Sequence, residues 1–171
     1  NVEVYRNFAT KLWNATRFCE MNDCLPKADF NPSTVTASQN KWIIHSVVQC
    51  KNDIDKALAQ YRFNDSAAAI YHFVYGAFCD WYLEFTKPLL AGNDEVLITE
   101  IKGTTGWFLD QILLMLNPFM PFITEELYTS IAKREEGAYL MEHKWPEYDD
   151  SLKSKEAEEH INWLIRIITE I

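Results

Sequence analysis

The chain has 171 residues, of which 48% are hydrophobic and 14% aromatic, and its formal net charge at pH 7 is −9. This apolar content excludes an intrinsically disordered chain, and the length fits one domain with a sizeable core. The acidic balance excludes indiscriminate attraction to polyphosphate, so a nucleic-acid contact has to come from a local patch. Residues 1–62 hold eight Lys and Arg against six Asp and Glu, whereas residues 63–171 hold eight against nineteen, so such a patch belongs in the N-terminal part.

Helical periodicity dominates the chain, and alternating runs of polar and apolar residues are nearly absent, which predicts an all-α helical bundle. A first helix is expected over residues 2–21, and it ends before Pro26. Ser38 is a suitable N-cap for a second helix that continues to about Tyr61.

A third helix is expected to begin near Asn64 or Asp65, either of which can cap it, and to continue to about Phe85. Pro88 follows shortly afterwards and predicts the end of the helix, because proline disrupts a helix interior. Several apolar residues of this helix have core-like spacing: Ile70, Phe73, Val74, Ala77, Trp81 and Phe85.

A fourth helix is expected over residues 94–116. It contains Gly103 and Gly106, and each glycine weakens a helix by about 1 kcal/mol relative to alanine. The two glycines therefore indicate a bend within this helix.

Two helices and an irregular strap complete the predicted fold. The fifth helix is expected at about residues 119–133, after prolines that suit a first helical turn. Residues 135–153 mix glycine, proline and acidic residues and predict an irregular strap, which Trp145 can pin to the bundle. The last helix is expected over residues 155–171.

The cysteines and the apolar segments bear on the cellular compartment. Four cysteines occur without a C-x-x-C pair: Cys19, Cys24, Cys50 and Cys79. Because the composition differs from that of small disulfide-framed secreted domains, we expect reduced thiols and a cytoplasmic location. No N-terminal stretch has the layout of a signal peptide, and the most apolar segment, residues 67–85, is interrupted by His72 and Asp80. We therefore predict no membrane span.

The first helix carries cationic and amide side chains among aromatic rings over residues 6–18. Cationic groups attract phosphates, amides can read base edges, and an aromatic ring can stack on an unpaired base, as in the recognition of single-stranded RNA. Short amphipathic helices with two or three basic residues are also common, so periodicity alone leaves an ordinary solvated face open.

Asp80 and Glu84 stand one helical turn apart in the third predicted helix. Three interpretations remain open. The two carboxylates can form a solvated pair helped by Lys87, they can accept from Arg6 or Arg17 of the first helix, or they can accept from a base amino group such as cytosine N4. Pairing between the helices is favoured, because elements of opposite local charge gain from facing each other.

Motifs for catalysis or cofactor binding are absent from the sequence. It contains no H-x-x-x-H or H-E-x-x-H spacing, no glycine-rich phosphate loop and no G-x-S-x-G elbow. A haem or metal held in the bundle by His45 and His72, or by cysteines, is a disfavoured alternative, because a lone histidine on an apolar helix is more often packed in the core. We expect no catalytic residue and no metal site.

Three groups of motifs resemble the anticodon-binding domain of bacterial-type valyl-tRNA synthetases, which are class I aminoacyl-tRNA synthetases. The first is Lys-Leu-Trp-Asn-Ala-x-Arg-Phe at residues 11–18, and the second is Asp-Trp-Tyr-Leu-Glu at residues 80–84. These two runs are the more selective for the valine enzyme. The third, a proline-phenylalanine segment at residues 117–127, also occurs in the synthetases for isoleucine and leucine, so it identifies only the wider group.

The resemblance implies a helical bundle of the class Ia type that holds the anticodon stem-loop of valine tRNA, whose last two anticodon bases are adenine and cytosine. In this family a separate nucleotide-fold domain activates valine with ATP, and its His-x-Gly-His and Lys-Met-Ser-Lys-Ser motifs are absent here. We therefore expect a fragment of a longer ligase that is inactive by itself and has no cofactor of its own. We also expect a monomer that binds neither DNA nor membranes.

The position of residues in the matching motifs implies an RNA-binding set. Its cations contact phosphates or base edges, its amides read bases, one ring stacks, and two residues of the third helix close the pocket. The set is Arg6, Lys11, Asn14, Arg17, Phe18, Asn22, Trp81 and Glu84. The main alternative is a helical scaffold for protein interaction or for structure alone, without specific RNA binding.

Overall fold

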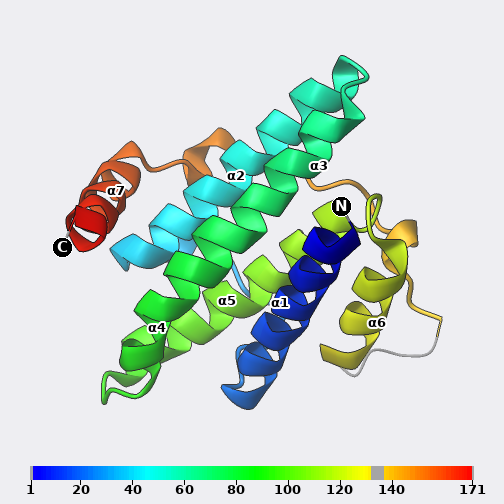
Figure 1. Ribbon diagram of the computed structural model, residues 1–171. Helices are drawn as coiled ribbons and strands as arrows, with labels where there is room; N and C mark the ends of the chain where they lie inside the picture. The colour runs from blue at the N-terminus through cyan, green and yellow to red at the C-terminus, as the bar shows by residue number, and fades with distance from the viewer. Residues whose placement is uncertain (1, 132–136, 171) are drawn as a thin grey trace.

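The computed structural model describes residues 2–131 and 137–170, and within these ranges the chain consists of helices and connecting loops without a strand. This confirms the predicted all-α bundle (Figure 1). The α-helices are α1 (Val2–Met21), α2 (Ser38–Ala59), α3 (Phe63–His72), α4 (Leu83–Leu90), α5 (Glu95–Leu116), α6 (Pro121–Ile131) and α7 (Lys155–Glu170). As far as the described residues go, none of these helices combines the length and apolar content that crossing a membrane requires.

The helices pack around one core. In Figure 1, α2 runs beside the long helix that contains α3 and α4, and α7 lies against α2 at one side of the bundle. On the other side, α6 contacts α1 and α5. The fully buried large side chains come from α1, α2, α5 and the long helix: Phe8, Leu12, Ile43, Ile44, Ile54, Ile70, Phe78, Tyr82, Ile101, Phe108, Leu109 and Ile112.

The long helix is not α-helical throughout. α3 and α4 are joined without a break by a π-helical segment, Phe73–Tyr82. Ala77 and Trp81, which the α-helical period predicts in the core, are only half-buried, whereas Phe78 and Tyr82 are fully buried. The wider turn of a π-helix shifts the buried side by one residue, and this explains why the α-helical prediction fails here.

Both predicted ends of the third helix are wrong. The helix begins at Phe63, before the expected caps Asn64 and Asp65. It ends at Leu90, so Pro88 lies within its final turn. A proline so close to the end removes a single backbone hydrogen bond, which the last turn tolerates better than a helix interior.

α5 runs through Gly103 and Gly106 without interruption. Both glycines mark places where the loop after α1 crosses this helix. A Cβ atom at Gly103 would lie 2.7 Å from the Phe30 ring, and one at Gly106 would lie 2.1 Å from the carbonyl oxygen of Leu25. The glycines therefore allow the loop after α1 to pack closely against α5.

The beginning of α2 is capped from another helix. Ser38 is the first helical residue, and the N-cap is Ala37, whose side chain cannot accept a hydrogen bond, so the predicted cap is wrong. The carboxylate of Glu100 in α5 accepts instead from the N–H groups of Thr36 and Ala37, both at 2.9 Å, and from the Asn40 amide at 2.8 Å. Burial opposes the charged form of Glu100, but these hydrogen bonds outweigh it and lower its pKa.

Residues 137–153 connect α6 to α7 as an irregular segment with two short 3₁₀ turns, Leu140–Glu142 and Asp150–Leu152. Trp145, the expected anchor, donates its Nε1–H to Asp55 Oδ1 of α2 at 2.8 Å. This bond ties the segment to the bundle.

Three of the predicted boundaries fall outside the described residues. These are the start of the strap at residues 135–136, the end of the fifth helix at Lys133, and the end of the last helix at Ile171. α6 begins at Pro121, slightly later than expected, and α7 begins at Lys155 as predicted.

Candidate functional site

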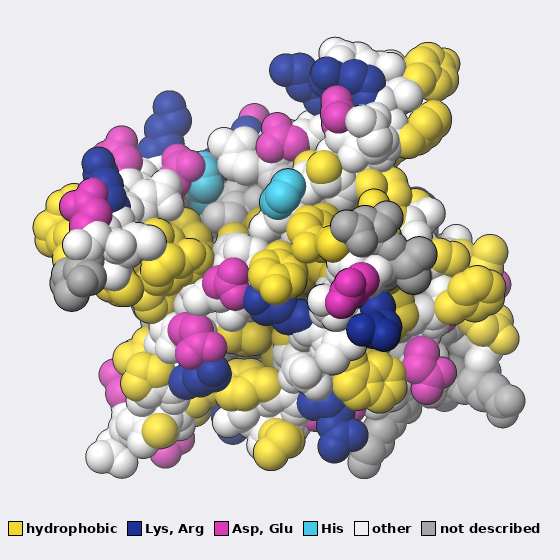
Figure 2. Space-filling view, viewed as in Figure 1, with side chains coloured by type: hydrophobic (Ala, Val, Ile, Leu, Met, Phe, Trp, Pro, Cys, Tyr) yellow, Lys and Arg dark blue, Asp and Glu magenta, His cyan; other side chains and the backbone are white. Residues whose placement is uncertain are grey.

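The outer side of α1 is the surface that the sequence motifs single out. Its inner side is buried, with Phe8 and Leu12 in the core. Arg6, Asn14 and Arg17 are exposed on the other side. The helical period of 3.6 residues produces this division, because side chains three or four residues apart share one side. Figure 2 shows basic and acidic side chains interspersed over the face that carries α1 and the long helix, so no broad cationic area covers it.

Arg6 and Arg17 keep most of their hydrogen-bond donors available to a ligand. Within the described part of the chain, Arg6 forms no ion pair. Arg17 Nε lies 3.9 Å from Glu20 Oε2 and its side chain is 62% exposed, so this pair contributes little. A rise of 1.5 Å per residue separates the two arginines by about 16 Å along α1. They would therefore contact different groups of an extended ligand.

Lys11 is held by the long helix. Its Nζ lies 2.5 Å from Asp80 Oδ1 and 3.4 Å from the centroid of the Tyr75 ring. Burial lowers the pKa of Lys11, but the hydrogen bond to Asp80 and the charge of that carboxylate outweigh burial and raise it. An ion pair between the helices is thus present as favoured, but its cation is Lys11, whereas Arg6 or Arg17 was expected.

The end of α1 places Phe18 and Asn22 next to each other. Phe18 is half-buried, and Lys87 Nζ of α4 lies 5.9 Å from its ring centroid. Asn22 Nδ2 donates to the Phe18 carbonyl at 2.8 Å and so satisfies a backbone group at the helix end. Asp23, with a φ of 56°, adopts the left-handed conformation that turns the chain away. Asn22 therefore has a structural task at the position where the motif implied base reading.

Glu84 and Trp81 lie on the long helix, in α4 and in the π-helical segment. Glu84 Oε1 accepts from Lys87 Nζ at 2.5 Å, and both side chains are about half exposed. Glu84 thus makes the contact with Lys87 that the first interpretation included, whereas Asp80 pairs with α1. Trp81 is half-buried and packs against Phe85, with ring centroids 5.8 Å apart. Since Lys87 also lies over Phe18, it connects α4 to the end of α1.

Sequence reasoning missed two members of this site. Lys87 was considered only as a partner of Glu84, although the spacing of three residues indicated that it shares their side of the helix. Tyr75 was not considered at all. Its contact with Lys11 depends on the π-helical geometry, which residue spacing does not reveal.

Groups that could support a metal or covalent chemistry are used for packing. No cluster of His, Cys, Asp and Glu in the described ranges could hold a metal ion. His45 is buried, and its Nδ1 accepts from the Ser154 N–H at 3.0 Å, which helps to join α7 to α2. Burial raises the pKa of the Cys24 thiol to about 11 and those of Cys50 and Cys79 to about 12. These thiols are protonated and poor nucleophiles at neutral pH.

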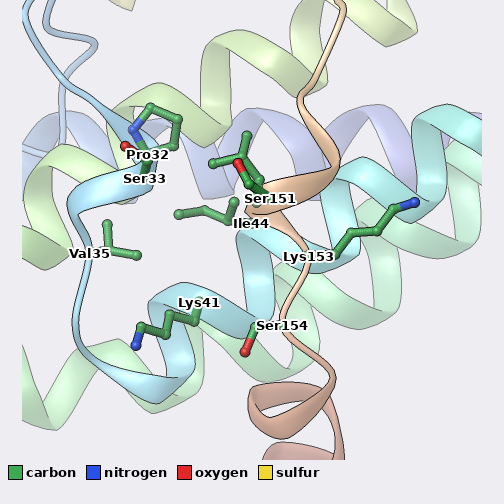
Figure 3. A pocket seen from close by; sticks show the side chains of 9 residues that line it. Pro32, Ser33, Val35, Lys41, Ile44, Ser151, Lys153 and Ser154 are labelled. Atoms are coloured by element: carbon green, nitrogen blue, oxygen red, sulfur yellow. The ribbon is translucent and has the colours of Figure 1, made fainter.

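A separate pocket of about 300 Å³ lies between the loop before α2 and the segment before α7 (Figure 3). It contains two lysines, Lys41 and Lys153, whose amino groups point to opposite sides in Figure 3. Lys153 is also paired with Asp150 at 2.6 Å. The pocket therefore does not gather positive charge toward one ligand.

Comparison with known proteins identifies the family to which the chain belongs. The family described as "Anticodon-binding domain of tRNA ligase" matches residues 40–171, well over half of the chain. The chain belongs to this family. Together with the relatives described next, this match confirms the resemblance inferred from the motifs.

Relatives that match nearly the whole chain extend the match over α1. A valine–tRNA ligase from Caulobacter vibrioides is 46% identical, over 99% of this chain and 19% of its own length. One from Rhizorhabdus wittichii is 45% identical over the same shares of the two chains. One from Rhodopseudomonas palustris is 49% identical over 78% of this chain and 14% of its own length. The chain thus spans less than a fifth of the length of these relatives.

Proposed function

We propose that this chain binds the anticodon stem-loop of valine tRNA, as one domain of a longer, cytoplasmic valine–tRNA ligase that uses ATP. The observation that carries the proposal is the similarity of nearly the whole chain, α1 included, to valine–tRNA ligases. In this proposal the domain is monomeric, binds no DNA and supplies no catalytic residue. Activation of valine belongs to the part of the ligase outside this chain.

The exposed residues of α1 and the neighbouring long helix are the proposed contacts. Arg6 and Arg17 would bind phosphates or base edges, because their donors are exposed and at most weakly paired. Asn14 would read a base edge, and Phe18 would stack on an unpaired base together with Trp81. These assignments agree with the usual division between backbone contacts and base readout.

Three residues of the motif set form hydrogen bonds or close ion pairs within the protein. Glu84 is paired with Lys87 on the solvent side and can still accept from a base amino group through its second oxygen. The Lys11 ammonium pairs with Asp80 of the long helix, and the Asn22 amide donates to the Phe18 carbonyl. We propose that Lys11 and Asn22 help to shape the site.

Replacing Arg17 by alanine tests the proposal. A valine tRNA anticodon stem-loop, titrated at moderate salt, should bind the variant about 1–3 kcal/mol more weakly than the unchanged chain. Arg166→Ala is the matched control, because Arg166 is an exposed arginine on α7, which lies against α2 away from α1. Equal losses for both variants, or none for Arg17→Ala, would count against the assignment.

Base substitution in the stem-loop tests specificity. A site built to pair with polar base edges penalises a base that leaves its groups unpaired. Exchange of the central adenine of the anticodon should therefore weaken binding more than exchange of the first anticodon base. Equal effects at the two positions would leave only nonspecific attraction to phosphate.

The exposed apolar side of α7 favours a second candidate function, a helical scaffold for protein interaction. Trp163 is 54%, Ile168 46% and Ile167 37% exposed. Salt separates the two candidates, because RNA binding through cationic contacts falls steeply as salt rises, whereas binding through an apolar surface changes little.

A further inference from the structure

Lys11 is clamped between two side chains of the π-helical segment. Asp80 Oδ1 lies 2.5 Å from its Nζ, and the centroid of the Tyr75 ring lies 3.4 Å away. The Lys11 side chain is 28% exposed, compared with 62% for Arg17, so its charge is partly withdrawn from solvent. We call Lys11, Tyr75 and Asp80 the α1 clamp.

The π geometry brings the two clamp residues of the long helix together. In an α-helix, which turns about 100° per residue, side chains five residues apart are separated by roughly 140° around the axis. A π-helix closes its hydrogen bonds over five residues and turns less per residue, so residues i and i+5 lie much closer to one side. Tyr75 and Asp80 have this spacing, and both contact Lys11. An ordinary α-helix would not present both to α1.

The clamp also sets the positions of the neighbouring aromatic rings. Trp81 follows Asp80 directly, and Phe18 lies about two turns beyond Lys11 on α1. A fixed contact between Lys11 and Asp80 therefore fixes the spacing of the two rings that are proposed to face a base. The contact of Lys87 with the Phe18 ring, at 5.9 Å from its centroid, lies at the outer limit of a cation–π interaction and is weak by itself.

We propose that Lys11 and Asp80 are positioning residues for anticodon binding, and that Lys11 does not contact a phosphate. This inference rests on the proposed function. The clamp holds α1 in the orientation in which Arg17 and Phe18 reach the RNA. The two roles for Lys11 make opposite predictions for Asp80. A carboxylate beside a phosphate contact repels RNA, so its removal would strengthen binding, whereas removal of half of a clamp weakens it.

The experiment is a titration of the 171-residue chain with a synthetic valine tRNA anticodon stem-loop at several salt concentrations. Lys11→Met and Asp80→Asn should each weaken binding about fivefold, the size expected for an exposed ion pair with a cation–π contact. The double variant should bind no more weakly than Lys11→Met, because that substitution already removes the ion pair with Asp80. The slope of log K against log[salt] should stay unchanged, whereas Arg17→Ala should reduce its magnitude by about one.

Two further variants separate positioning from loss of charge. Lys11→Arg should retain near-normal binding, because a guanidinium can pair with Asp80 and stack on Tyr75. Glu126→Gln removes an exposed carboxylate of α6 for which the described residues show no ion pair, and it should leave affinity nearly unchanged. Hydrogen exchange without RNA supplies an independent measure, and the amides of α1 should exchange faster in Asp80→Asn.

Tighter binding by Asp80→Asn, or a salt slope reduced by about one in Lys11→Met, would overturn the positioning role and assign Lys11 to a phosphate. Unchanged exchange in α1 would also overturn it. Failure of the proposed function looks different. In that case the unchanged chain binds an unrelated stem-loop as tightly as the valine one, and the clamp then has no role in recognition. Hydrogen exchange would still show whether the clamp holds α1.

Discussion

Replacing Gly106 by alanine should destabilise the protein, even though alanine is the better helix former. Two effects of opposite sign compete at this position. In a helix interior, alanine is favoured over glycine by about 1 kcal/mol. Against this, the new Cβ would lie 2.1 Å from the carbonyl oxygen of Leu25 and 2.8 Å from the nitrogen of Pro26.

The unfavourable contact outweighs the gain in helix propensity because it involves backbone atoms. No change of rotamer can move the Leu25 carbonyl, so the loop after α1 would have to shift away from α5. Overpacking typically costs about 1–3 kcal/mol and occasionally more. A separation of 2.1 Å places the overpacking cost at the upper end of this range. After the gain in helix propensity is subtracted, the free energy of unfolding falls by about 2 kcal/mol. For a protein of this length, that corresponds to a fall in Tm of roughly 4–8 °C.

Gly103→Ala is the matched control, since it makes the same change one helical turn earlier. Its Cβ would lie 2.7 Å from the ring of Phe30, which is a half-buried side chain that can rotate away. The gain in helix propensity should then offset most of the packing cost. We expect this variant to stay within about 1 kcal/mol of the unchanged protein.

Urea unfolding followed by far-ultraviolet circular dichroism measures both variants against the unchanged protein. The midpoint of Gly106→Ala should fall clearly below that of Gly103→Ala at similar m-values. A midpoint for Gly106→Ala at or above that of the unchanged protein would show that the loop does not lie against α5 as closely as the Cβ distances require.

Two further predictions concern ionisable groups. All four cysteines are buried, and burial raises their pKa values. A thiol reagent at mildly alkaline pH should therefore modify none of them in the folded protein and all of them in urea. Rapid reaction of any one cysteine in the folded protein would contradict its burial. Because the folded pKa of Glu100 is lowered, its charge stabilises the fold above the unfolded pKa, and this stabilisation is lost as pH falls through the lowered value. Glu100→Gln should therefore lower the urea midpoint at neutral pH and converge with the unchanged protein in acid, whereas a difference independent of pH would refute the capping role.

The sequence predicts the end of α1 and the beginning of α5, whose determinants are local. α1 ends at Met21, as expected from the turn-forming residues that follow. α5 begins after Asp94, whose side chain accepts from the Leu97 N–H at 3.0 Å. The cap of α2 fails as a prediction because its acceptor, Glu100, comes from another helix. Nothing near Ser38 in the sequence reveals that partner.

The π-helical segment marks a second limit of sequence reasoning. Periodicity finds a helix over this region, and Phe73 is buried as predicted. The π-helical segment packs against α1 and α2, and Phe78 lies against Phe108 of α5. This tertiary packing places Phe78 and Tyr82 on the buried side, where the α-helical period predicts Ala77 and Trp81. A periodic pattern cannot show such a shift of one residue in advance.

Which cations remain available for a ligand also depends on tertiary structure. The motif spacing indicates Arg6, Lys11 and Arg17 equally, because all three stand on one helix with similar surroundings in the sequence. Only the placement of Asp80 against α1 separates them, since it engages Lys11 and leaves the arginines exposed. The sequence therefore predicts the surface, while the fold decides the role of each residue on it.

The net charge of −9 is compatible with RNA binding because the electrostatic potential at α1 depends mainly on the charges close to it. At physiological ionic strength, exposed charges more than about 8 Å apart are largely screened, so acidic residues on distant helices contribute little at α1. Close to α1, Asp80 and Glu84 are each paired with a lysine. Arg6 and Arg17 are then the charges that a phosphate would meet first. The pairing of Lys11 with Asp80 thus neutralises a carboxylate that would otherwise repel RNA, in addition to the positioning role proposed for it.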